Sequence, residues 1–375
     1  MWTMDAVERE WLRGGRIAYH PHDVVDAFNV VERTLGRVWM EASRTFDGMV
    51  AWGPNSTAAI VDMGQQLASL EGVVGAEELI TRLKRNDESA NAELTAVHLL
   101  RRDRPSAEVE LGPVVTVGTG SRKPDFRVRA EASDPWTYVE VAQPDVSEIQ
   151  ERVQALMNHL IAPIRDAKKS YGLEVFLRRE PMEREVDRLV SRIRELCSSD
   201  GLLREELPDG LGLLLLNHTQ PGMVILDDHG EPHVPRLGRT QFIRGGSEPH
   251  RHIAVRLAFS DERAESFLTT EARQLPTEAP GLIMIQVGRA PGGFTSWEPL
   301  IIRRFQPTIH TRVSAVCLLG GGWVPTPDGE KLLPQTKLLR NPHAALPLPR
   351  WIAESLTKAG EEFDRYTSPD TTTSL

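Results

Sequence analysis

Asp125 and Glu140 stand in two short segments, KPDFRVR at 123–129 and YVEVA at 138–142, whose valines suit the half-buried face of a β-sheet. Ser133-Asp134-Pro135 between them is turn chemistry, so the two segments are predicted to form a hairpin. A turn centred between residues 132 and 133 places Asp125 opposite Glu140. Side chains in such a pair lie roughly 4.5–5.5 Å apart at Cβ, where like charges are destabilising. A divalent cation bound by both carboxylates removes that conflict.

This pattern resembles the PD-(D/E)xK nuclease family, in which Pro-Asp is followed by an acidic residue in the next strand. In that family a helix before the hairpin carries a further acidic residue, and Glu93 in the predicted helix 88–100 fits that role. The resemblance covers roughly residues 87–180. It implies an α/β fold of the restriction-endonuclease type, a mixed sheet flanked by helices.

The same resemblance implies a chemistry. It predicts metal-dependent hydrolysis of phosphodiester bonds in nucleic acid, with DNA favoured as the substrate. Asp125 and Glu140, helped by the Val141 carbonyl, are expected to hold Mg²⁺ or Mn²⁺, with Glu93 completing the site. The metal would lower the pKa of a bound water and neutralise charge in the transition state.

The sequence departs from the family at the motif lysine, because the position two residues after Glu140 is Ala142. The expected register places Lys123 opposite Ala142, so Lys123 is predicted to be the substitute cation. Gln143 points to the other face of a regular strand, and Lys168 and Lys169 are more distant candidates. The alternative is a catalytically degenerate protein with the nuclease fold, which binds nucleic acid or a protein partner without cleaving it.

Charge limits the kind of partner. A formal net charge of −9 argues against a general polyanion binder. Between residues 101 and 129, however, basic residues outnumber acidic ones, and this excess indicates either a solvated face or a phosphate-binding surface beside the proposed site. The residues predicted to contact nucleic acid are Arg101, Arg122, Arg127 and Lys168.

Composition indicates a globular chain of 375 residues, long enough for two units. Its two cysteines, Cys197 and Cys317, indicate neither a disulfide framework nor a zinc site. Charged residues near the N-terminus do not match a signal peptide, and no apolar run is long enough to span a bilayer. We therefore expect a cytoplasmic protein with no membrane partner, and the oligomeric state stays open.

Four regions are predicted along the chain. Residues 1–86 form a helical region, 87–204 the nuclease-like αβ core, 205–363 a further αβ region, and 364–375 a disordered tail. The helical region is expected to contain helices at 23–44, 55–70 and 76–84. The core is expected to contain a strand near 109–111, a helix at 147–169, a strand at 174–177 and a helix at 183–197. The C-terminal region either extends the sheet of the core or forms a second αβ layer.

Overall fold

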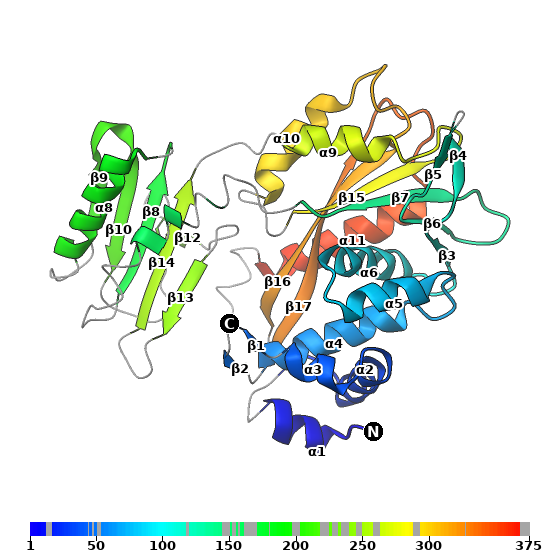
Figure 1. The fold of residues 1–375 in the computed structure, drawn as a ribbon, viewed down its shortest axis with the longest axis horizontal. Helices are drawn as coiled ribbons and strands as arrows, with labels where there is room; N and C mark the ends of the chain where they lie inside the picture. Colours follow the sequence, from blue (N-terminus) through cyan, green and yellow to red (C-terminus); the bar gives the residue numbers. More distant parts are fainter. Residues whose placement is uncertain are drawn as a thin grey trace. The chain divides into compact units, whose positions relative to one another are not determined.

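The architecture is that of an α/β protein, seen in a computed structural model (Figure 1). The structure describes residues 1–12, 17–43, 45–46, 49–50, 54–117, 120–144, 151, 155–156, 158–160, 171–179, 181–196, 203–217, 225–226, 232–233, 240–244, 250–257, 263–287, 293–326 and 328–367. The chain divides into two compact units, and unit 2 comprises residues 144–261 and 290–297. Unit 1 comprises the remaining residues and contains the candidate site.

A six-stranded mixed sheet organises unit 1, in the order β17-β16-β15-β7-β6-β3. Three strands at one end, β3, β6 and β7, are antiparallel neighbours, whereas β7, β15 and β16 run parallel and β17 is antiparallel to β16. The strands are β3 Glu108–Leu111, β6 Phe126–Arg129, β7 Thr137–Ala142, β15 Gly281–Gln286, β16 Ala315–Thr326 and β17 Gly329–Arg340. The C-terminal strands thus extend the sheet of the hairpin, which was one of the two arrangements left open.

The predicted hairpin register is confirmed. Phe126 pairs with Val139, Arg127 with Tyr138 and Val128 with Thr137. The apolar residues Phe126, Val128 and Val139 are fully buried in one core cluster with residues of the helix before the hairpin. Burial of these residues fixes the register, because a slip by one residue would turn them to the opposite face.

Helices cover both faces of the sheet. The helix α6, Glu88–Arg101, packs against β7, and α11, Arg350–Thr367, packs against β16 and β17. The helix α9, Arg263–Ala272, contacts β7 and β15. Figure 1 shows α9 on one side of the sheet and α6 with α11 on the other. Because α11 continues to Thr367, the tail predicted to be disordered from residue 364 is helical for its first residues.

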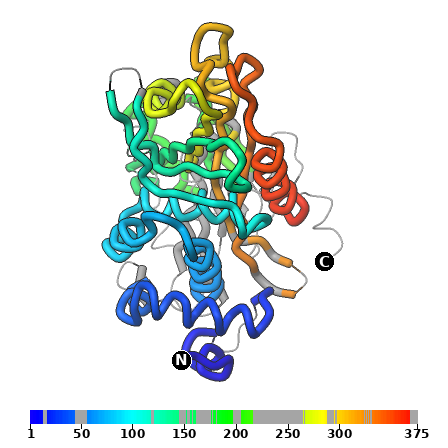
Figure 2. The backbone as a smooth tube through the Cα atoms, turned by 90° about the vertical axis from the view of Figure 1, so that its right-hand side faces the viewer, coloured from blue at the N-terminus to red at the C-terminus, as the bar shows by residue number. Residues whose placement is uncertain are grey.

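The N-terminal region is helical, as predicted. Its elements are α1 Met4–Val7, a π-helical turn at Glu8–Leu12, α2 Pro21–Thr34, α3 Arg37–Ala42, the short pair β1 Thr45–Phe46 and β2 Met49–Val50, α4 Pro54–Ala68 and α5 Ala76–Lys84. The bounds expected for α5 are confirmed, and those for α4 differ by two residues at most. The single helix expected at 23–44 is wrong. It is broken at Gly36, whose φ of 98° lies outside the range that a right-handed helix requires. Figure 2 shows these helices stacked at the N-terminal end of the chain.

Unit 2 has its own sheet, of order β13-β14-β8-β10-β9. Its elements are β8 Tyr171–Leu177, α8 Glu183–Leu196, β9 Leu203–Leu207, a 3₁₀ turn at Pro208–Gly210, β10 Gly212–Asn217, β11 Ile225–Leu226, β12 Pro232–His233, β13 Thr240–Arg244 and β14 His250–Leu257. The strand expected at 174–177 and the helix expected at 183–197 therefore belong to this unit. The long helix expected at 147–169 lies largely outside the described residues; those described within it, 151, 155–156 and 158–160, are helical.

The division into units differs from the predicted boundaries at 86/87 and 204/205. The N-terminal helices share one hydrophobic core with α6 and the sheet, so no boundary falls at residue 86. Unit 2 is inserted between β7 and α9, and the chain then returns to finish the first sheet. Such an insertion leaves no mark in composition, because both units are ordinary αβ structure.

Candidate active site

The candidate site continues an ordered pattern on one face of the strands β3, β6 and β7. Glu108 pairs with Arg129 and Glu110 with Arg127 across β3 and β6. Each is an ion pair, with 2.6 Å between Arg129 Nη2 and Glu108 Oε2 and 2.9 Å between Arg127 Nε and Glu110 Oε2. Both guanidinium groups also lie over the ring of Trp136, at 4.2 and 4.4 Å from its centroid. Every acid in these two rows therefore has a basic partner in the adjacent strand.

The next row of the sheet has no basic residue to neutralise its acids. Continuing the register of β6 and β7 by one residue brings Asp125 beside Glu140. In β3 the corresponding place is taken by Gly112, whose N–H donates to the Asp125 carbonyl at 2.7 Å. No arginine occupies this row, and two carboxyl groups meet instead. Like charges in such a pair are destabilising unless a proton or a cation is shared.

The two carboxyl groups are in contact. Asp125 Oδ2 accepts a hydrogen bond from the N–H of Val141 at 2.6 Å, and the Asp125 and Glu140 side chains hydrogen-bond to each other. Glu140 is only 4 % exposed, and within the described part of the chain its Oε1 has no hydrogen-bond partner. Burial, with the negative charge of Asp125 added to it, raises the pKa of Glu140 to about 10. At neutral pH this carboxyl group keeps a proton unless a cation takes the proton's place.

Glu93 lies at the same site, but its carboxylate is engaged by an arginine. Arg82 of α5 contacts both oxygens of Glu93, with Nη1 to Oε2 at 2.9 Å and Nη2 to Oε1 at 2.8 Å. Burial raises the pKa of Glu93 to about 7, although the Arg82 hydrogen bond opposes that shift. The role expected for Glu93, completing the metal site, stays a prediction, and in this structure Arg82 contacts both of its oxygens. Glu93 thus fixes the Arg82 guanidinium.

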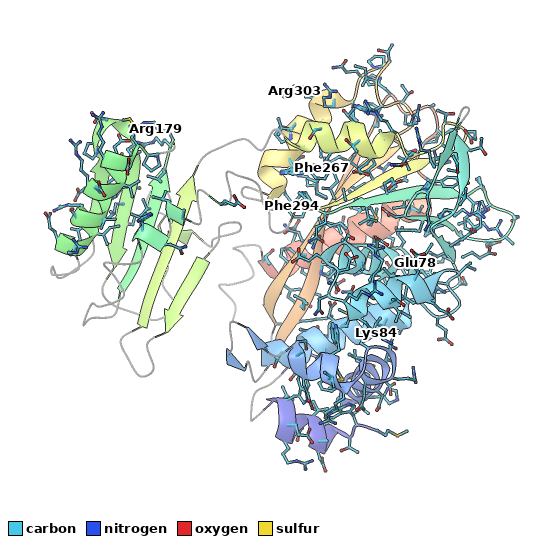
Figure 3. All side chains as sticks on the ribbon, viewed as in Figure 1. Glu78, Lys84, Arg179, Phe267, Phe294 and Arg303 are labelled. Carbon is cyan, nitrogen blue, oxygen red and sulfur yellow. The ribbon has the colours of Figure 1, made fainter. Side chains whose placement is uncertain are left out.

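A small cavity of about 120 Å³ lies beside Arg82, Glu93 and Asp125. It is lined by Gly75, Glu78, Leu79, Arg82, Glu93, Leu111, Gly112, Lys123, Pro124 and Asp125. Figure 3 labels Glu78 on α5, one helical turn before Arg82. The cavity thus joins α5, the first half of α6, the end of β3 and the segment that enters β6. It places both an arginine and a lysine beside Asp125.

Lys123 reaches the site by a different route from the predicted one. The β6–β7 pairing begins at Phe126 and Val139, so Lys123 is not paired with Ala142. Lys123 instead follows the hairpin of β4, Val115–Val117, and β5, Gly120–Arg122. Its side chain is 57 % exposed, its Nζ lies 3.6 Å from Glu78 Oε2, and its positive charge helps to lower the pKa of Asp125 against the effect of burial.

The other candidates proposed to replace the motif lysine are Gln143, Lys168 and Lys169. Gln143 donates from Nε2 to Glu88 Oε2 at 2.8 Å, at the N-terminus of α6. Lys168 and Lys169 lie outside the described residues. Ala142, at the position of the family's lysine, is 5 % exposed.

Two groups of this site were missed by sequence reasoning. The sequence does not indicate that Arg82 belongs to the site, because a basic residue on an amphipathic helix is ordinarily solvated. Glu271, on α9, is half-buried, and its pKa is raised by burial and by the negative charge of Asp125. It adds an acid from the helix that packs on β7. Glu271 and Glu140 are far apart in the sequence, so the sequence alone did not show that they are close in space.

The predicted nucleic-acid contacts have mixed outcomes. Arg101 donates to the backbone carbonyls of Ser69 and Glu71, which gives it a structural role at the end of α6. Arg127 is neutralised by Glu110, as described above. Arg122 is exposed beside the site, whereas Lys168 lies outside the described residues. Most of the basic side chains between residues 101 and 129 are therefore engaged in contacts within the protein.

The donor set fits a hard divalent cation in part. Asp125 and Glu140 supply adjacent carboxyl oxygens, one of them buried and unpartnered, and Mg²⁺ is typically bound through one or two carboxylates. Within the described ranges, no group of three or more His, Cys, Asp or Glu side chains is arranged to hold a metal ion. The residues present therefore fit a cation held by two protein carboxylates with water and substrate oxygens, rather than a closed cage.

Comparisons with other proteins do not identify this site. No helix among the described residues is both long and apolar enough to cross a membrane. Comparison with protein-family models and with curated proteins found no match to this chain.

Proposed function

We propose that this protein hydrolyses phosphodiester bonds of nucleic acid, DNA in preference, at a site centred on Asp125 and Glu140. The observation that carries the proposal is the pair formed by half-buried Asp125 and buried Glu140, in which Glu140 Oε1 has no partner within the described residues. An isolated pair of this kind is unfavourable in a folded protein, because burial penalises the negative charge of both groups. A bound divalent cation would make the arrangement favourable.

Each residue then has a defined part. Asp125 and Glu140 hold the cation, and the hydrogen bond from the Val141 N–H fixes the orientation of the Asp125 carboxylate. Mg²⁺ or Mn²⁺ held by these two residues would make a water more acidic and would offset negative charge on the phosphate. Lys123, beside Asp125 in the same cavity, provides a mobile positive charge at the mouth of the site. Glu93 acts indirectly, through Arg82.

The test is cleavage of labelled double-stranded DNA, single-stranded DNA and RNA in Mg²⁺ or Mn²⁺ by four proteins. Wild type and the matched control Glu108→Gln, an acid of a compensated row on the same sheet, are expected to cleave. Asp125→Asn and Glu140→Gln are expected to lose at least about 100-fold in rate, since each removes a ligand of the only proposed cation. Cleavage that persists in both of these variants, or that continues in a chelator, overturns the proposal.

A second function is favoured by one specific observation. The family's lysine position holds the buried Ala142, and Lys123 is exposed and paired with Glu78. This arrangement suits a catalytically degenerate protein that binds nucleic acid or a protein partner without cleavage. It predicts binding of nucleic acid that weakens with salt and is indifferent to a chelator, whereas the enzyme should depend on the metal. Fluorescence anisotropy of labelled DNA, measured with and without EDTA, separates the two.

A further inference from the structure

Arg82 is held in the site cavity by contacts with Asp87, Ser89 and Glu93. Its Nε donates to Asp87 Oδ2 at 2.9 Å, and Nη2 donates to Ser89 Oγ at 2.5 Å. With the bond from Nη1 to Glu93 Oε2, three of its N–H groups donate hydrogen bonds, and Nη2 also lies 2.8 Å from Glu93 Oε1 in an ion pair. A guanidinium group carries five N–H donors. Among the described residues, the second N–H of Nη1 is therefore left without a partner.

The place of this guanidinium sets it apart from other paired arginines of the chain. Arg192, on α8, is likewise engaged by two acids, Glu195 and Glu205. Arg82, however, lines a cavity that also receives Asp125 and Lys123. That cavity, of about 120 Å³, has room for a phosphate group, because a single water molecule needs only about 10–15 Å³ of such volume.

We propose that Arg82 binds a phosphate oxygen of the substrate through its remaining N–H, supplying from α5 the positive charge that Ala142 cannot supply from β7. The proposal rests on the function proposed above. The acidic side chains around the cavity repel an anion, and a bound divalent cation is needed to offset that repulsion. Asp87, Ser89 and Glu93 hold the planar group in one orientation. A preorganised donor of this kind needs no rearrangement when charge develops on the phosphate.

Lysine could not replace arginine in this role. A guanidinium group has a rigid fork that serves three acceptors and still presents a donor to a fourth, whereas an ammonium group has only three donors in all. Arg82→Lys should therefore keep the charge near Glu93 but lose the contact with phosphate. This difference separates binding of the anion from simple neutralisation of the acids.

The experiment measures binding of inorganic phosphate to the Mn²⁺-loaded protein by calorimetry, after Mn²⁺ binding itself has been measured. The variants are Arg82→Lys, Arg82→Gln and the double variant Arg82→Gln/Glu93→Gln, which removes the ion pair as a unit and covers failure of Arg82→Gln to fold. Arg192→Gln is the matched control. Loss of a hydrogen bond to a charged group should weaken phosphate binding at least about tenfold in all three Arg82 variants. Mn²⁺ affinity should change less than threefold in Arg82→Lys, and Arg192→Gln should match wild type.

The outcomes distinguish the two proposals. Mn²⁺ binding that depends on Glu140, together with phosphate binding that is unchanged in Arg82→Lys and in the double variant, overturns the role of Arg82 alone. Mn²⁺-loaded wild type that binds no phosphate overturns it as well. Absence of Mn²⁺ binding to the wild type overturns both this role and the proposed function.

Discussion

Lys123 lies over Gly112, so closely that a Cβ on this glycine would stand 2.6 Å from Lys123 Cε and 3.2 Å from its Nζ. In the two preceding rows of the sheet, the β3 position carries a glutamate that pairs with an arginine of β6. At Gly112 the side chain is absent, and the lysine from the β5–β6 connection occupies the space. Position 112 therefore controls where the positive charge beside Asp125 can lie.

Gly112→Ala is expected to displace Lys123. The contact is with the flexible end of the lysine, so the clash itself is relieved cheaply. The φ of 59° at this position adds a strain of roughly 1–2 kcal/mol for a residue with a Cβ. We expect a small loss of stability by urea denaturation and a larger loss of cleavage, matched by Lys123→Gln. Full activity in Gly112→Ala would show that the position of Lys123 is irrelevant.

The metal-free protein should become less stable as pH rises, through Glu140. Its folded-state pKa of about 10 lies above the ordinary value of 4.5, so the folded state binds the proton more tightly than the unfolded state. The contribution to stability is complete below pH 4.5 and is lost as pH rises toward 10, by up to about 1.4 kcal/mol per pH unit. Glu140→Gln should remove this slope and, at pH 8 without metal, be more stable than wild type in urea. If Glu140→Gln is less stable than wild type at pH 8, then Glu140 does not keep a buried proton in the folded state.

Binding of Mn²⁺ should strengthen with pH for the same reason. The cation replaces the proton on Glu140, so the apparent affinity rises by up to tenfold per pH unit below that pKa. Saturating Mn²⁺ at about 100 times its dissociation constant stabilises the folded state by about 2.7 kcal/mol. Thermal denaturation between pH 6 and 9 should show this gain in wild type and its absence in Asp125→Asn. If the stabilisation by Mn²⁺ does not change with pH, the metal binds at a site other than Glu140.

His98 should produce the opposite pH dependence. Its Nδ1 lies 2.8 Å from Ser69 Oγ, and burial lowers its pKa to about 4. The unfolded state binds the proton more readily, so the stability contributed by neutral His98 is complete above pH 6.5 and falls as pH drops toward 4. The difference in unfolding free energy between wild type and His98→Gln should shrink over this window. A difference that stays constant from pH 7 to pH 4.5 argues against a buried neutral imidazole.

Gly64→Ala tests the packing beneath the N-terminal helices. A Cβ at Gly64 of α4 would come within 2.5 Å of Cα and Cβ of Ala27 on α2. Backbone contact of this kind cannot be relieved by a rotamer change, so the helices must separate. We expect a loss of about 1–3 kcal/mol in urea denaturation. The exposed neighbour Gln65→Ala serves as the control and should be nearly neutral.

The sequence by itself determined the local structure that carries the acids. The hairpin register followed from the turn centred between residues 132 and 133, and alternation supports it, because a slip by one residue would turn Phe126, Val128 and Val139 to the opposite face. The extent of α5 and of most of α6 followed from the pattern of the sequence, and the structure adds that the Asp87 side chain caps α6 by accepting from the Ser89 N–H at 2.9 Å. These are short-range relations, in which neighbours in sequence decide the outcome.

Tertiary structure alone decided how the site is completed. Arg82 and Glu271 come to Asp125 from two separate helices, α5 and α9, and no period or spacing in the sequence links them to it. Ion pairing across β3 and β6 also neutralised Arg127, one of the residues that the sequence had assigned to nucleic acid, and its neighbour Arg129. The insertion of unit 2 after β7 hid the fact that β15, β16 and β17 belong to the first sheet. Each of these outcomes depends on distance in space between residues far apart in the chain, and only packing determines that distance.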